Sequence, residues 1–196
     1  MGVFDLPEGY AEFRRVNLQK DKKLAVCINA AALIIAALLV PLGLFMAPIS
    51  FGAIFESFIY SPVGLLLRSL MLICGLLIYL IAHELVHGIF IKKYSGRRAK
   101  YGFTGLYAYA GSAAYFNKRC YLIIALAPVV LLGALFLVLN VFLPIEWFWL
   151  VYLLQVINLS GAAGDLYVTA IMRKFPDDTL TQDTGFEMTF YSHETL

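Results

Sequence analysis

Two histidines and a glutamate stand close together in the segment His83-Glu84-Leu85-Val86-His87, within an otherwise apolar stretch. On an α-helix, residues four apart differ by about 40° in direction and ~6 Å in height. Both imidazoles can therefore reach one cation, while Glu84 stands beside it. This pattern is typical of a catalytic zinc site, in which one coordination position stays open. Ionisable groups inside apolar helices are costly and usually functional, which favours a site over a chance cluster.

The helix that carries this motif belongs to a chain with the composition of a membrane protein. Of its 196 residues, 61% are hydrophobic and 14% are charged, and the mean hydropathy is +0.80. A typical soluble domain has about a quarter charged residues. About 20 apolar residues cross the hydrocarbon core as a helix. Four such spans are predicted, at residues 24–49, 63–91, 121–143 and 145–172.

The segment between the second and third spans has a different pattern. It is rich in glycine and aromatic residues, and Leu106, Ala108 and Ala110 alternate with tyrosines. Such alternation favours a strand or hairpin over a helix. A cytoplasmic loop with exposed aromatic residues is the alternative. We therefore predict an all-α membrane protein with four transmembrane helices and a short strand-like or hairpin segment between helices two and three.

The charge distribution predicts the orientation of the spans. Basic residues cluster before the first span, between the second and third, and after the fourth, whereas the other two loops carry Glu56 and Glu146. By the positive-inside rule, both termini and the second loop are cytoplasmic. We expect an integral protein of a bacterial cytoplasmic membrane. Its predicted parts are a cytoplasmic N-terminal segment (1–23), a transmembrane metallopeptidase-like domain (24–172) and a cytoplasmic tail (173–196).

Catalytic zinc normally has three protein ligands, so a third is needed beside His83 and His87. Asp165 is the only other acidic residue deep in a span, and spans two and four run in the same direction. All three side chains should therefore lie at a similar depth. The alternative for Asp165 is a carboxylate that is hydrogen-bonded between helices. Asn158, two turns away, is a candidate for binding substrate or supporting a zinc ligand, or for an interhelical hydrogen bond.

The sequence resembles the site-2 protease type of intramembrane zinc metallopeptidase, and more narrowly the small bacterial zincin peptidases. The likeness covers about residues 63–172 and rests on four features: His-Glu-Leu-Val-His-Gly, a glycine-rich loop, Asn-Lys-Arg before an Ala-Pro, and Asn158 seven residues before Asp165. The resemblance implies that His83, His87 and Asp165 bind Zn²⁺ and that Glu84 is catalytic.

These observations predict a membrane-embedded zinc metalloprotease that hydrolyses peptide bonds in or near the membrane. Glu84 would be the general base, and Leu106, Ala108 and Ala110 would hold an extended substrate by strand addition. The expected partners are the lipid bilayer and a membrane-protein or peptide substrate. We expect no nucleic-acid partner and predict no oligomeric state. Two alternatives stay open: a zinc-dependent membrane hydrolase of a lipid-linked or small amide substrate, and a non-catalytic metal-binding membrane scaffold.

Overall fold

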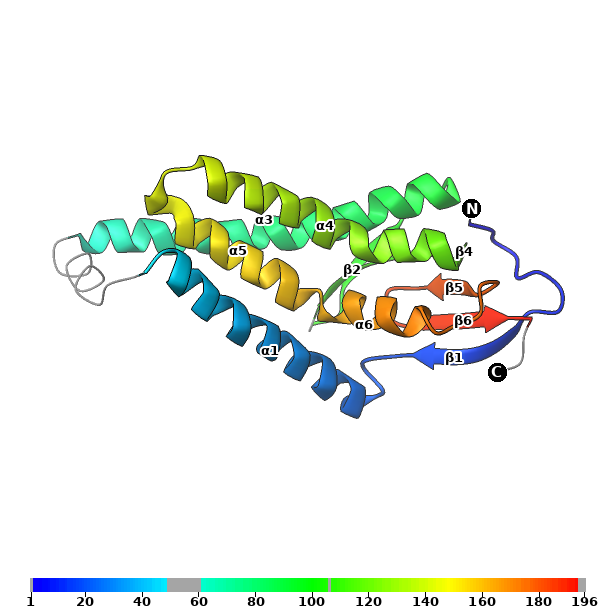
Figure 1. Ribbon diagram of the computed structural model, residues 1–196. Coiled ribbons are helices and arrows are strands. Elements are labelled where there is room, and N and C mark those ends of the chain that lie inside the picture. Colours follow the sequence, from blue (N-terminus) through cyan, green and yellow to red (C-terminus); the bar gives the residue numbers. More distant parts are fainter. Residues whose placement is uncertain (1, 49–60, 106, 194–196) are drawn as a thin grey trace.

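The computed structural model describes residues 2–48, 61–105 and 107–193. The loop with Glu56 and the predicted substrate contact Leu106 lie outside the described residues. Long helices run side by side over most of the molecule, and the strands gather at one end (Figure 1). The helices are α1 (Lys22–Met46), α3 (Pro62–Ser95), α4 (Lys118–Phe142), the short η1 (Ile145–Trp147), α5 (Phe148–Gly161) and α6 (Ala163–Met172).

Three of these helices are long and apolar enough to cross a membrane: α1, α3 and α4. The ends of α3 follow local sequence rules. The Ser61 side chain accepts a hydrogen bond from the Gly64 N–H at 3.3 Å, and Pro62 occupies the first helical position. Gly96 ends the helix in the left-handed conformation with φ of 75°, which glycine adopts without steric cost.

The fourth predicted span is broken. Residues Ile145–Gly161 and Ala163–Met172 form two helical segments whose axes differ by 41°. The break falls at Ala162, which has non-helical dihedral angles, φ −82° and ψ 14°. Gly161, directly before it, weakens the helix because glycine is a poor helix former. The bent pair can still count as one crossing by length and composition.

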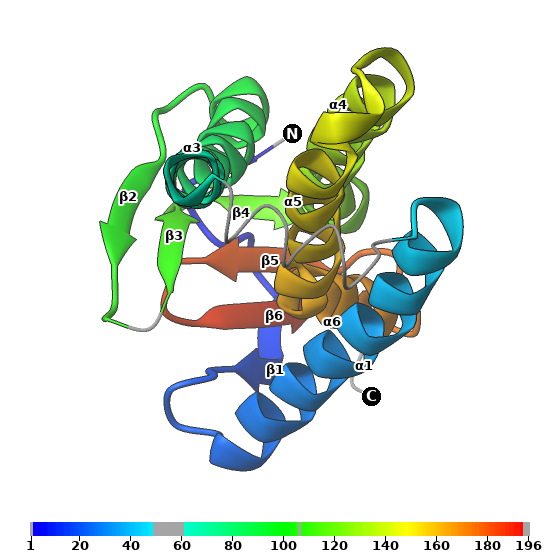
Figure 2. The ribbon, with the colours of Figure 1, turned by 90° about the vertical axis from the view of Figure 1, so that its left-hand side faces the viewer.

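The prediction of an all-α fold is wrong, because six strands form two antiparallel sheets among the described residues. The strands are β1 (Ala11–Val16), β2 (Lys100–Phe103), β3 (Ala108–Gly111), β4 (Tyr115–Asn117), β5 (Leu180–Asp183) and β6 (Met188–Ser192). The larger sheet has the order β1-β6-β5-β4, and the smaller one pairs β2 with β3. Figure 2 shows β2 and β3 beside α3, in the segment where the sequence alternates.

The larger sheet joins the two ends of the chain. In the β1–β6 pair Val16 lies opposite Met188, and in the β4–β5 pair Phe116 lies opposite Thr181. The β5–β6 turn contains Gly185 with φ of +86°, and the Asp183 side chain accepts a hydrogen bond from the Gly185 N–H at 2.8 Å. Such a contact is typical of turns that begin with aspartate. The N-terminal and C-terminal segments are therefore one structural unit.

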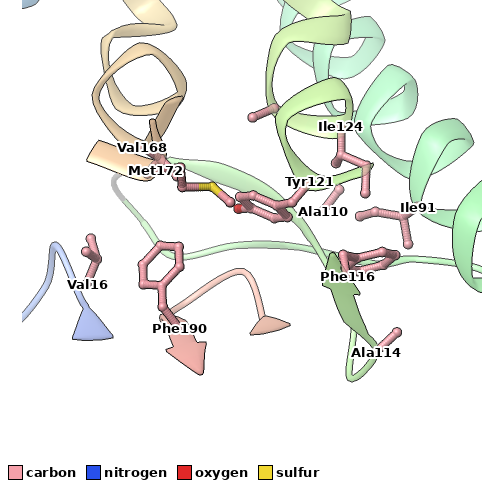
Figure 3. Close-up of a cluster of buried hydrophobic side chains, with 11 residues drawn as sticks. Val16, Ile91, Ala110, Ala114, Phe116, Tyr121, Ile124, Val168, Met172 and Phe190 are labelled. Atoms are coloured by element: carbon pink, nitrogen blue, oxygen red, sulfur yellow. The ribbon is translucent and has the colours of Figure 1, made fainter. Parts of the chain in front are cut away.

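A buried cluster attaches this sheet to the helices. Phe116 of β4 and Phe190 of β6 are 1% and 0% exposed and pack with Tyr121 of α4 and with Val168 and Met172 of α6 (Figure 3). Full burial of a phenylalanine side chain contributes about 1.5–3 kcal/mol. The sheet is thereby fixed against the first turns of α4 and the second half of α6, the helix that carries Asp165.

Candidate metal centre

His83 and His87 lie one turn apart on α3, and their imidazoles face Asp165 of α6. His83 Nε2 lies 3.3 Å from Asp165 Oδ2, and His87 Nε2 lies 3.7 Å from the same oxygen. One ligand atom from each of the three residues lies within 4.8 Å of the others. The helix spacing and the common depth that the sequence indicates thus bring these three side chains together.

These distances fit a bound zinc ion. With Zn–N and Zn–O bonds of roughly 2.0–2.2 Å, two ligands of a tetrahedral ion lie about 3.3–3.6 Å apart. Two imidazoles and one carboxylate are also a donor set found at catalytic zinc, with the fourth position left for water or substrate. The residues present therefore fit the metal that the sequence motif implies.

The break between α5 and α6 determines where Asp165 lies. Because α6 begins at Ala163, Asp165 falls in its first turn. The 41° bend lies just before this turn and changes the direction of the chain ahead of Asp165. The Asp165 carboxylate faces the two imidazoles of α3, which are its partners among these apolar helices.

Each imidazole has a second partner on its Nδ1 side. His83 Nδ1 lies 3.3 Å from the hydroxyl oxygen of Tyr79, one turn earlier on α3. His87 Nδ1 lies 2.9 Å from the backbone carbonyl oxygen of Ile124 on α4. In both rings Nε2 therefore faces Asp165. Metal-binding histidines usually have this arrangement, in which one ring nitrogen holds the metal and the other is hydrogen-bonded to an outer partner.

Glu84 differs from the three clustered residues. It is partly buried on α3 beside His83 and is not a member of the group within 4.8 Å. Glu84 is thus a carboxylate on the same helix as the two histidines that is not among the clustered ligand atoms. General bases act on a proton and do not need to hold the metal.

The other predicted site residues lie outside this cluster. Asn158 is fully buried, and its amide N–H donates to the Val129 carbonyl oxygen at 3.0 Å, an interhelical hydrogen bond. Ala108 and Ala110 are in β3, and Ala110 belongs to the buried core at the sheet. The third histidine of the chain, His193, was not predicted as a site residue, and its ring packs on Tyr10 with ring centroids 4.2 Å apart.

Two polar residues that the sequence analysis did not consider lie next to the centre. Tyr121 of α4 donates its hydroxyl hydrogen to Asp183 Oδ2 of β5 at 2.5 Å. Burial raises the pKa of Asp183. The charge of His87 lowers this pKa, and the charge of Asp165 raises it. In the sequence, Asp183 could have been found from the turn residues Asp183-Thr184-Gly185, which lie between two stretches of strand-forming residues.

Two glycines lie next to residues of the centre, Gly88 after His87 and Gly164 before Asp165. Gly88 makes room for an aromatic side chain, and Gly164 borders open space. A Cβ at Gly88, the residue after His87, would overlap the hydroxyl of Tyr101 in β2. At Gly164 a Cβ would meet no atom within 4 Å. Gly164 instead lines a cavity of about 60 Å³ between α6 and the β5–β6 turn, together with Asp183, Tyr107 and Tyr167. This volume is enough for several water molecules.

Comparison with protein families gave one match. A family described as "Putative zincin peptidase" matches residues 76–180, which is more than half of the chain and includes the motif and Asp165. Searches of curated proteins and of solved structures found no match. The chain therefore belongs to this zincin peptidase family, which places it among the zinc metallopeptidases.

Proposed function

We propose that the protein is a membrane-embedded zinc metalloprotease of the site-2 type, which hydrolyses peptide bonds in or near the bilayer. The observation that carries the proposal is the convergence of His83, His87 and Asp165 within 4.8 Å, on helices of which α3 is apolar enough to span a membrane. Family membership supports the chemistry. The geometry supports the assignment of these three residues as ligands.

The membrane location is supported by apolar surface on the long helices. Leu33, Ile34 and Leu38 of α1 are 72%, 60% and 69% exposed. In the most apolar 18-residue stretch of α1, no residue is buried. A soluble protein rarely exposes apolar surface on this scale, whereas a bilayer covers it. We infer that α1, α3, α4 and the bent pair of α5 and α6 cross the bilayer.

The proposed orientation follows from charge at one end of the helices. Lys22 at the start of α1, Lys93 near the end of α3, Arg119 at the start of α4 and Arg173 after α6 all belong to helix ends on the side of the sheets (Figure 1). Basic residues concentrate on the cytoplasmic side of membrane proteins. The sheets and both termini are therefore assigned to the cytoplasm.

The proposed chemistry assigns a role to each side chain. Zinc, when bound, supplies a Lewis acid that polarises the scissile carbonyl and lowers the pKa of water. Glu84 accepts a proton from the attacking water and delivers it to the leaving amine. His83 and His87 hold the ion through Nε2, and Asp165 adds a negative charge while leaving the fourth position free. The apolar helices around them strengthen each electrostatic interaction.

The proposed substrate is a peptide in extended conformation. A helical substrate hides its peptide bonds in backbone hydrogen bonds, so it must unwind before cleavage. The β2–β3 sheet has two strands and contacts α3, and no third strand pairs with it among the described residues. Its edge is suited to strand addition, with Ala108 and Ala110 in β3.

The proposal is tested with purified protein in liposomes that contain a fluorescent transmembrane peptide. We expect about one zinc per chain and cleavage that stops on chelation and returns with zinc. His83→Ala should abolish both metal binding and cleavage. Cleavage of a lipid-linked amide but of no peptide would establish the alternative hydrolase. Bound zinc without any hydrolysis would establish a metal-binding scaffold, and either result would refute the protease assignment.

A further inference from the structure

A proline in the middle of α4 removes one helical hydrogen-bond donor next to the candidate centre. In an α-helix the carbonyl of residue i accepts from the N–H of residue i+4. The residue four positions after Ile124 is Pro128, which has no N–H. The Ile124 carbonyl therefore lacks its usual partner within the helix.

The missing hydrogen bond to the Ile124 carbonyl is important because this part of α4 is buried. Ile124 is 3% exposed, and Pro128 is fully buried. A freed carbonyl at a solvent-exposed position would bind water, but a buried carbonyl needs a donor from the protein. The donor that the structure provides is the imidazole of His87, with Nδ1 2.9 Å from the Ile124 oxygen.

This hydrogen bond has only one possible direction. A carbonyl oxygen only accepts, so the hydrogen must be on Nδ1 of His87. In the neutral ring, Nε2 then carries the free lone pair, and Nε2 is the nitrogen that faces Asp165 at 3.7 Å. The contact thus selects the tautomer that a metal ligand requires.

The other histidine is held less strictly. The partner of His83 Nδ1 is the Tyr79 hydroxyl at 3.3 Å, and a hydroxyl can both donate and accept. This contact is compatible with either tautomer of His83. Of the two histidines, only His87 is hydrogen-bonded to a group that excludes the tautomer with hydrogen on Nε2.

We propose that Pro128 is a positioning residue for the metal centre: by removing a helical donor, it reserves the Ile124 carbonyl for His87 and fixes the tautomer of that ligand. This inference rests on the proposed function only in taking His87 as a ligand. It gives a reason for a proline within a helix that otherwise gains from uninterrupted hydrogen bonding. The proposed sequence of effects runs from Pro128 through a main-chain oxygen to an imidazole.

The first test compares Pro128→Ala with Pro41→Ala by competition for zinc with a chromogenic chelator. Alanine at position 128 restores an N–H that competes with His87 for the Ile124 carbonyl. We expect zinc affinity to fall about 10-fold, within the 10–100-fold range for loss of an outer partner. Pro41 also lies inside an apolar helix, α1, and frees a carbonyl away from the centre. Its substitution should leave zinc affinity unchanged. Wild-type affinity in Pro128→Ala would overturn the proposal.

A second test does not depend on whether Pro128→Ala folds. Nitrogen-15 NMR of the wild-type protein, labelled at histidine and loaded with zinc, should show hydrogen on Nδ1 of His87 and zinc on Nε2. Hydrogen on Nε2 would overturn the proposal. If the protein binds no zinc, the proposed function fails. In that case the spectrum of metal-free Asp165→Ala at alkaline pH, where imidazole is neutral and no Asp165 carboxylate competes at Nε2, still distinguishes the Nδ1–H form that we expect from the Nε2–H form that refutes the inference.

Discussion

Asp165→Ala is the substitution that most sharply tests how the centre is built. Its Oδ2 lies 3.3 Å from His83 Nε2 and 3.7 Å from His87 Nε2, close to the separation of two ligands on one zinc ion. Glu84 is not within the group of ligand atoms that lie 4.8 Å apart or less, so no described carboxylate replaces the lost one. The variant therefore keeps two protein ligands where a catalytic site needs three.

The expected loss of affinity follows from this count. Removing an outer partner of a metal ligand costs 10–100-fold in affinity, and removing a ligand itself should cost more. We expect zinc affinity to fall at least ~100-fold, or at least ~2.7 kcal/mol. Asp165→Asn keeps an oxygen but loses the negative charge, and its affinity should lie between those of wild type and Asp165→Ala.

The assay is zinc content after dialysis against a series of chelator concentrations. Two variants control for the loss of any carboxylate or imidazole. Asp177→Ala removes a solvent-exposed carboxylate that pairs with Lys118, and His193→Ala removes the imidazole that packs on Tyr10. Both should bind zinc as wild type does. Wild-type zinc affinity in Asp165→Ala would refute the assignment of Asp165 as a ligand.

Three further predictions concern residues around the centre. Tyr79→Phe should lower zinc affinity by up to ~10-fold, less than any ligand loss, because only the outer hydrogen bond of His83 disappears; a loss as large as that of His83→Ala would contradict this. Gly88→Ala should raise KM and leave zinc content unchanged, because its Cβ overlaps the Tyr101 hydroxyl and forces that side chain of the β2–β3 hairpin to move; an unchanged KM would argue against substrate binding at the hairpin. Burial raises the pKa of Asp183 above 3.8, so its stabilisation is complete below about that pH and is lost as pH rises through the raised pKa. The Tm of metal-free wild type, measured relative to Asp183→Asn, should therefore fall as pH increases from 4 to 7, and a parallel pH dependence of the two proteins would contradict it.

The central helix and the relation of the three clustered residues could be predicted from the sequence because both depend on local rules. The four-residue spacing of His83 and His87 determines that they share a helix face. The depth of Asp165 follows from counting residues to the basic end of its span. The bend at Ala162 could not be foreseen, since no proline marks it and small residues occur in continuous membrane helices as well.

The larger sheet was missed for a different reason. Its strands have three to six residues, and they are far apart in sequence, with β1 paired to β6. Short strands give little periodic signal, and pairing between chain ends depends on tertiary packing, here around Phe116 and Phe190. Asp183 is a neighbour of the centre because β5 packs beside α4, and the sequence does not show this packing.

The most direct measurement of the central claim is peptide cleavage by Glu84→Gln in zinc-loaded liposomes, with zinc content determined on the same sample. Glutamine keeps the size and hydrogen bonding of the side chain but cannot accept a proton. We predict zinc content equal to wild type and a turnover lower by at least ~10²-fold, the usual scale for loss of a general base. Wild-type turnover in Glu84→Gln with zinc bound would contradict the account.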